Sequence, residues 1–136
     1  MPRPGLTPGT SRHGAGGRVV STAELCYRTA VGTHLALFAL LMSWILALAP
    51  PPAGLITPVL LVVVAPLLAP LRGLLARRRY TMAWSTLLIL AYLVHGIYFA
   101  AGPAPARWLG GTETLLVLIY FATVTAYMRL TRPSPA

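Results

Sequence analysis

The chain has 136 residues, of which 57% are hydrophobic and only 10% are charged, with a formal net charge of +9. Because a soluble domain usually carries about 25% charged residues, this composition excludes an ordinary soluble domain and predicts a protein of the lipid bilayer. The positive charge does not indicate nucleic-acid binding, because the arginines lie between and beside apolar runs rather than along one basic face. The single cysteine, Cys26, excludes an internal disulfide, and no cysteine and histidine cluster has metal-ligand spacing.

The N-terminal segment, residues 1–20, is predicted to be a disordered cytoplasmic tail because it is rich in glycine and proline and poor in apolar side chains. Ser21 and Glu24 have the spacing of a capping box, so we expect the first helix to begin near Ser21. A transmembrane domain is predicted for residues 21–130, and a second cytoplasmic tail for residues 131–136.

Four apolar runs predict membrane-spanning helices at about residues 29–49, 55–75, 80–101 and 108–130. A cleaved signal peptide is the alternative for the first run, but its uncharged stretch is long and Pro50 follows it directly, which favours a retained anchor. In the second run, Pro66 and Pro70 predict bends. The predicted fold class is therefore an all-α integral membrane four-helix bundle made of two helical hairpins.

An arginine-rich hinge between the hairpins carries Arg72, Arg77, Arg78 and Arg79. Four spans place both termini on the side of this hinge. That side carries ten arginines and the other side only Arg107, so the positive-inside rule predicts that both termini and the hinge lie in the cytoplasm. The hinge arginines are also candidates for binding anionic lipid headgroups.

Ionisable residues inside the spans are the first candidates for function, because burying them in a membrane is costly. At about 1.5 Å per residue from the cytoplasmic arginines, His95 and Glu113 share one layer near the far face, where they could pair. His34 lies about 15 Å away from His95 in depth, which argues against one haem held by both histidines. Ser85 and Thr123 lie at the depth of His34 and could satisfy its ring nitrogens.

Residue spacing also defines one face on the third span and one on the first. A stripe at steps of four and three on the third span is predicted to face the bundle interior: Thr81, Ser85, Leu88, Tyr92, His95 and Phe99. A small-residue face on the first span allows close approach of another helix: Gly32, Ala36, Ala39, Ser43 and Ala47. The candidate internal polar site is therefore Tyr92, His95 and Glu113, with His34, Ser85 and Thr123. The structural alternatives are histidines that only pack, and a Glu113 that only complements a helix dipole.

Three segments resemble a family of short proteobacterial inner-membrane proteins, catalogued as domain-of-unknown-function family 2069. They are Pro70-Leu71-Arg72-Gly73-Leu74-Leu75, Arg78-Arg79-Tyr80-Thr81-Met82-Ala83-Trp84 and Tyr92-Leu93-Val94-His95-Gly96, and Arg107-Trp108-Leu109 with Glu113 fits the same pattern. The resemblance covers residues 30 to 130. It implies a four-helix inner-membrane protein and supplies no activity, substrate or catalytic residue.

The sequence offers no nucleophile paired with a base, no phosphate-binding loop and no set of four metal ligands. We therefore predict no catalytic residue, no metal ligand and no cofactor. The leading hypothesis is a non-enzymatic accessory or scaffolding component that binds itself or another membrane protein through its helix faces. The alternative is a small transporter or proton-coupled module built on Tyr92, His95 and Glu113. A second alternative is a redox subunit that binds quinone or haem at a dimer interface.

Overall fold

The computed structural model describes residues 13–48 and 50–135, and helices make up most of them. Helix α1 (His13–Ser43) continues into a π-helical turn, η1 (Trp44–Leu48), and is followed by α2 (Ile56–Val63), α3 (Ala65–Leu75), α4 (Arg79–Ala100) and α5 (Ala106–Leu130). The described ranges contain no strand. Four segments are long and apolar enough to cross a membrane: Ser21–Leu48, Ile56–Leu75, Arg79–Ala100 and Ala106–Leu130. The predicted all-α four-span fold is therefore confirmed.

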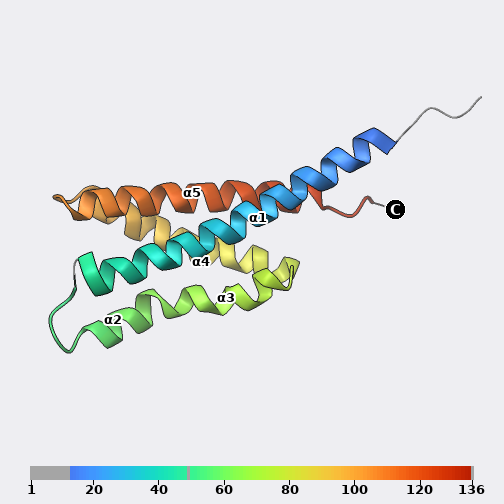
Figure 1. The fold of residues 1–136 in the computed structure, drawn as a ribbon. Coiled ribbons are helices and arrows are strands. Elements are labelled where there is room, and N and C mark those ends of the chain that lie inside the picture. The colour runs from blue at the N-terminus through green and yellow to red at the C-terminus, as the bar shows by residue number, and fades with distance from the viewer. Residues whose placement is uncertain (1–12, 49, 136) are drawn as a thin grey trace, which may run out of the picture.

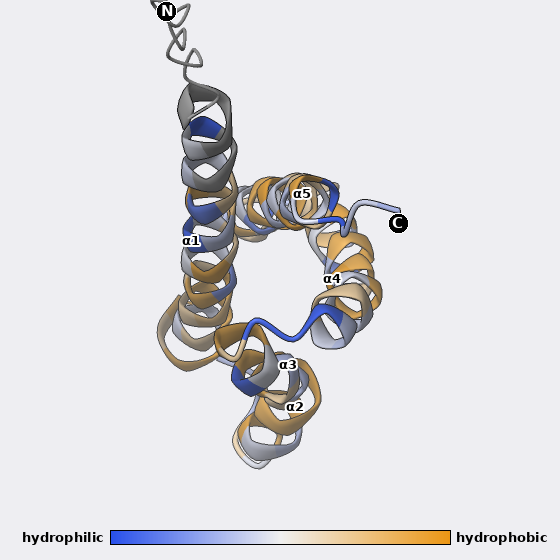
Figure 2. Ribbon diagram, turned by 90° about the vertical axis from the view of Figure 1, so that its right-hand side faces the viewer, coloured by the Kyte–Doolittle hydropathy of each residue, from blue (hydrophilic) through white to orange (hydrophobic). Residues whose placement is uncertain are grey.

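The spans form a closed ring in which α5, at the end of the chain, returns to pack against α1 (Figure 2). Helix α4 packs mainly on α5 and also on α3, while α2 contacts η1 and α3. The fully buried core includes Leu37, Leu41, Leu67, Val117 and Tyr120. Large apolar side chains also remain exposed on the outer faces of all four spans, as expected for a surface solvated by lipid.

The hinge between α3 and α4 lies at the same end of the bundle as the start of α1 and the C-terminal end of α5 (Figure 1). The loops between η1 and α2 and between α4 and α5 lie at the other end (Figure 1). This arrangement confirms that the hinge lies at the same end as the start of the first span and the end of the fourth (Figure 1). We call these the hinge end and the loop end of the bundle.

The start of the first helix differs from the prediction. Helix α1 begins at His13, so residues 13–20 are helical and the predicted start at Ser21 is wrong. The carboxylate of Glu24 binds two arginine side chains instead of reaching back to the Ser21 amide. Once the apolar span is helical, each further residue adds a hydrogen bond at little cost, so the helix extends past the expected cap. Residues 1–12 of the predicted tail lie outside the described residues.

The second span is broken where a bend was predicted. Helix α2 ends at Val63 and α3 begins at Ala65, one residue before Pro66, whereas Pro70 lies inside α3. Pro66 has no N–H to donate, and the Leu67 N–H donates to the carbonyl of Val64 at 3.1 Å. The carbonyl of Val63 therefore lacks the donor that a continuous helix would supply. A side chain of α4 provides one, as described below.

Candidate functional site

The predicted pair of ionisable residues is formed near the loop end of the bundle. His95 on α4 places Nδ1 at 3.0 and 2.9 Å from the two carboxylate oxygens of Glu113 on α5. The Glu113 side chain is 0% exposed and that of His95 is 32% exposed. The first turn of α5 contains no acidic residue, which excludes the helix-dipole alternative for Glu113. The structure therefore forms the contact that the shared depth of these two residues made possible.

Two glycines bring the backbones of α4 and α5 close enough for this pair to form. A Cβ atom at Gly110 would collide with the backbone nitrogen of Ala100 and lie 2.6 Å from the carbonyl oxygen of Gly96. A Cβ atom at Gly96 would lie 2.7 Å from Oγ1 of Thr114. Real Cβ atoms do not make such contacts, so Gly110, which meets the α4 backbone, must be glycine, whereas a Cβ at Gly96 would displace the Thr114 side chain. Nothing in the sequence predicts this role, although Gly96 follows His95 directly.

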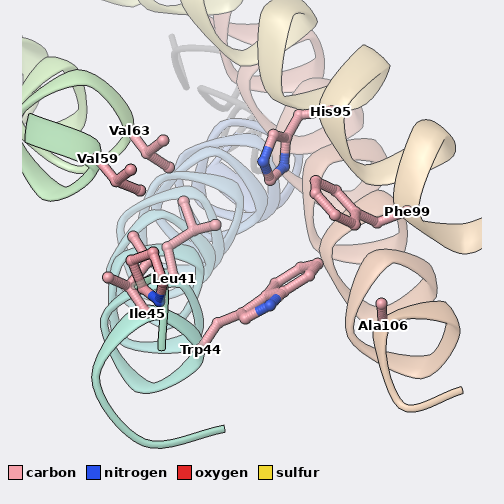
Figure 3. A pocket seen from close by; sticks show the side chains of 9 residues that line it. Leu41, Trp44, Ile45, Val59, Val63, His95, Phe99 and Ala106 are labelled. Carbon is pink, nitrogen blue, oxygen red and sulfur yellow. The ribbon is translucent and has the colours of Figure 1, made fainter. Parts of the chain in front are cut away.

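The imidazole of His95 also forms part of the wall of a cavity of about 240 Å³ (Figure 3). The lining comes from α1, η1, α2, α4, α5 and the first loop: Leu41, Trp44, Ile45, Pro51, Val59, Val63, His95, Phe99 and Ala106. In this set His95 is the one ionisable side chain. The cavity is therefore an apolar chamber with a single proton-binding group in its wall.

Aromatic rings surround the exposed edge of His95. Its ring centroid lies 4.8 Å from that of Phe99 and 5.9 Å from that of Trp44. The rings of Trp44 and Phe99 meet edge-to-face at 4.9 Å. Trp44 is the first residue of the π-helical turn η1, which buries both Trp44 and Ile45. Single π-helical turns are rare and are frequent at functional sites.

Tyr92 was predicted to join this site, but its hydroxyl has a different partner. It donates a hydrogen bond to the carbonyl of Val63, the group left without a donor at the break between α2 and α3. Tyr92 also lines a second cavity of about 260 Å³ that reaches His95 from the hinge side. Tyr92 therefore supports the wall beside the His95–Glu113 pair without hydrogen bonding to it.

His34 belongs to a separate buried cluster. It is 1% exposed, and its Nε2 donates to the carbonyl of Leu67 at 2.8 Å. The prediction that Ser85 and Thr123 satisfy its ring is wrong. Ser85 shares a hydrogen bond of 2.7 Å with the hydroxyl of Tyr120, and Thr123 donates to carbonyls of its own helix, as serine and threonine often do. Nδ1 of His34 has no partner within the described part of the chain.

The two predicted helix faces have opposite environments. All six residues of the α4 stripe are buried or half-buried, which confirms that the stripe faces the bundle interior. All five residues of the small-residue face of α1 are exposed, and a Cβ at Gly32 would meet nothing within 4 Å. The bundle itself therefore does not use that face.

Two of the four hinge arginines hold the hinge end together. Arg77 binds both carboxylate oxygens of Glu24 at 2.9 and 3.1 Å and lies 4.0 Å above the ring of Tyr27. This hydrogen bonding raises the pKa of Arg77. Arg77 also ends α3 in the left-handed conformation, with φ of 54°, which is unusual for a residue with a side chain. Arg79 donates to the carbonyls of Met128 and Thr131.

The described residues contain no group of three or more His, Cys, Asp or Glu side chains placed to hold a metal ion. His34 contacts α3 and His95 contacts α5, so each histidine is committed to its own partner. The geometry defines a small four-span membrane protein with a buried carboxylate–imidazole pair beside an apolar cavity.

The chain belongs to the family described as "Predicted membrane protein (DUF2069)", whose sequence profile matches residues 29–132. The matched region contains most of the first span, all of the other three, the hinge and the His95–Glu113 pair. The resemblance inferred from the hinge and the His-Gly segment is thereby confirmed. Comparison with curated proteins and with solved structures gave no significant match.

Proposed function

We propose that the protein is a non-enzymatic, proton-coupled module of the bacterial inner membrane, with both termini in the cytoplasm. The observation that carries this proposal is the fully buried carboxylate of Glu113 against His95, whose ring lines an apolar cavity. Ionisable residues at such a depth are expensive to bury and are characteristic of proton relays and transport sites. The ratio of ten arginines to one supports the orientation.

Proton binding and cavity occupancy are coupled by the energetics of charge in an apolar interior. With one exchangeable proton, the pair is either a neutral acid beside a neutral imidazole or an ion pair, and it carries no net charge in either form. Loss of that proton leaves one net negative charge in surroundings that solvate it poorly. Release therefore requires water or a polar ligand in the cavity beside His95. An apolar occupant holds the proton in place.

Trp44 provides an optical test of this coupling, because its ring lies 5.9 Å from that of His95 and indole emission responds to a change in nearby charge. The test uses the full chain in lipid nanodiscs, with Trp84→Phe and Trp108→Phe leaving Trp44 as the single tryptophan. We expect Trp44 fluorescence to change with pH, and His95→Asn to abolish the change. His34→Asn is the matched control. His34 also lies within a membrane-spanning helix and is more deeply buried than His95, but it contacts Leu67 and Tyr120 instead of Trp44.

The cavity's part in the process is tested by filling it. Ala106→Leu places an aliphatic side chain in the cavity and is expected to suppress the fluorescence transition by excluding water. Ala101→Leu, at an exposed position next to the same loop, is expected to leave the transition intact. The proposed function is contradicted if the pH-dependent change in Trp44 fluorescence persists in His95→Asn, or if Ala106→Leu leaves it unchanged.

A second candidate function is an accessory or scaffolding role, supported by the exposed small-residue face of α1. Such faces let two membrane helices approach closely enough for extensive packing. Energy transfer between labelled copies in vesicles measures self-association, and co-purification measures other membrane partners. We expect Ala36→Leu with Ala39→Leu to reduce association, and Ala122→Leu on the outer face of α5 to leave it unchanged. A strictly monomeric protein without co-purifying partners refutes this role.

A further inference from the structure

The hinge arginines divide into two pairs with different environments. Arg77 and Arg79 are occupied by protein groups, the first by Glu24 and the second by carbonyls at the end of α5. Arg72, in the last turn of α3, and Arg78, just before α4, make no side-chain hydrogen bond or ion pair to any described residue. The positive charges of these two side chains are therefore not used in holding the bundle together.

Arg72 and Arg78 line the same cavity. This cavity has a volume of about 410 Å³ and is bounded by Ala69, Arg72, Gly73, Ala76, Arg78 and Thr81. The Thr81 side chain packs directly against Gly73 here, because a Cβ at Gly73 would collide with it. The other α3 residues in the lining are small, and Arg72, Arg78 and Thr81 supply its polar side chains.

The chain has no acidic side chain left to neutralise this cavity. It contains two such residues in total. Glu24 binds Arg28 and Arg77, and Glu113 binds His95. With two arginines and no acidic side chain in its lining, the cavity is favourable for an anion from outside the chain. Guanidinium groups match phosphate oxygens with paired, charge-assisted hydrogen bonds.

The surroundings of the cavity indicate the source of that phosphate. Leu68, Arg72 and Leu75 lie at helical spacing on one face of α3, and both leucines are at least half exposed. On a membrane-spanning helix, exposed leucines face acyl chains, and an arginine one turn further lies at headgroup level. We propose that this cavity binds the phosphodiester of an anionic phospholipid, held by Arg72 and Arg78, with the acyl chains along Leu68.

The proposal is tested with the full chain in mild detergent, by native mass spectrometry. The probes are dioctanoyl phosphatidylglycerol, dioctanoyl phosphatidylcholine and inorganic phosphate. We expect the anionic lipid to be retained in preference to both others. Replacing both arginines, as Arg72→Gln with Arg78→Gln, is expected to weaken its binding roughly 30-fold, because each arginine near the membrane surface contributes about fivefold.

The matched control removes two charges from the same end of the bundle. Arg129→Gln with Arg132→Gln alters a different cavity, between α4 and α5, and is expected to change lipid binding far less. Ala69→Leu is a second variant that keeps every charge and fills the proposed cavity, so it should also weaken binding. Equal losses in the two arginine pairs would show a diffuse positive surface and overturn the proposal. Phosphate binding as tight as lipid binding would overturn the assignment to a lipid.

Discussion

Tyr92 shows how one hydroxyl can stabilise an interrupted membrane helix. Pro66 removes a backbone donor, the Leu67 N–H turns to Val64, and the carbonyl of Val63 is left for the Tyr92 hydroxyl. In a bilayer no water is available to take that role, so an unpaired carbonyl there is costly. Tyr92 thus joins α4 to the break between α2 and α3, beside the wall that holds His95.

We predict that Tyr92→Phe lowers the free energy of unfolding by about 1 to 3 kcal/mol, the cost of leaving a buried acceptor unsatisfied. Denaturation in micelles, followed by circular dichroism, measures the effect. Tyr98→Phe is the control, because Tyr98 is 75% exposed and no hydrogen bond is found for its hydroxyl within the described structure. If the two variants were equally stable, the Val63 carbonyl would have another way of being satisfied.

At the scale of the elements, the contact between α4 and α5 controls the candidate site. These helices approach through Gly96 and Gly110, one turn or less from the residues of the pair. A carboxylate and an imidazole have short reach, so a small separation of the two axes would break the 2.9 Å contact. The glycines and the ionisable pair are therefore one structural unit.

Gly110 and Gly111 are adjacent on α5, so comparing alanine substitutions at the two positions distinguishes loss of the close helix contact from a change in helix propensity. We predict that Gly110→Ala forces α4 and α5 apart, removes the pH-dependent fluorescence of Trp44 and destabilises the bundle, because its Cβ meets the α4 backbone. Gly111→Ala has free space around its Cβ and should be neutral or stabilising by up to about 1 kcal/mol. Thermal unfolding and the Trp44 titration check both variants. Identical behaviour of the two would refute the close-contact role of Gly110.

The sequence predicted well those features that depend only on a residue's position along its own helix. Hydropathy and length predicted the spans, and counting residues from the arginines placed His95 level with Glu113. What it missed depends on which helices are lateral neighbours. The partner of His34 is a carbonyl of α3, and the partner of Tyr92 is a carbonyl at a helix break; neither donor–acceptor pair has a sequence signature. The close contact at Gly110 likewise appears only once α4 and α5 are placed together.

For the molecule as a whole, charge is concentrated at the end where the ring is tied together. Glu24 on α1 is joined to the hinge through Arg77, and the end of α5 is joined to the start of α4 through Arg79. The Glu24–Arg77 ion pair and the hydrogen bonds of Arg79 are exposed, so each contributes little stability by itself. Their combined effect is geometric, because they join α1 to the hinge and α4 to α5 at one membrane surface.

This concentration of charge determines the predicted orientation, which is measurable without any knowledge of ligand. Arginine-rich loops stay on the cytoplasmic side of the inner membrane, so the hinge end should face the cytoplasm and Arg107 the periplasm. In a Cys26→Ser background, Ala104→Cys in the loop before α5 should react with a membrane-impermeant thiol reagent added to intact cells. Ser134→Cys should react only after the cells are permeabilised. The reverse labelling would show that the chain inserts against its own charge bias, and would place the His95 cavity on the cytoplasmic side.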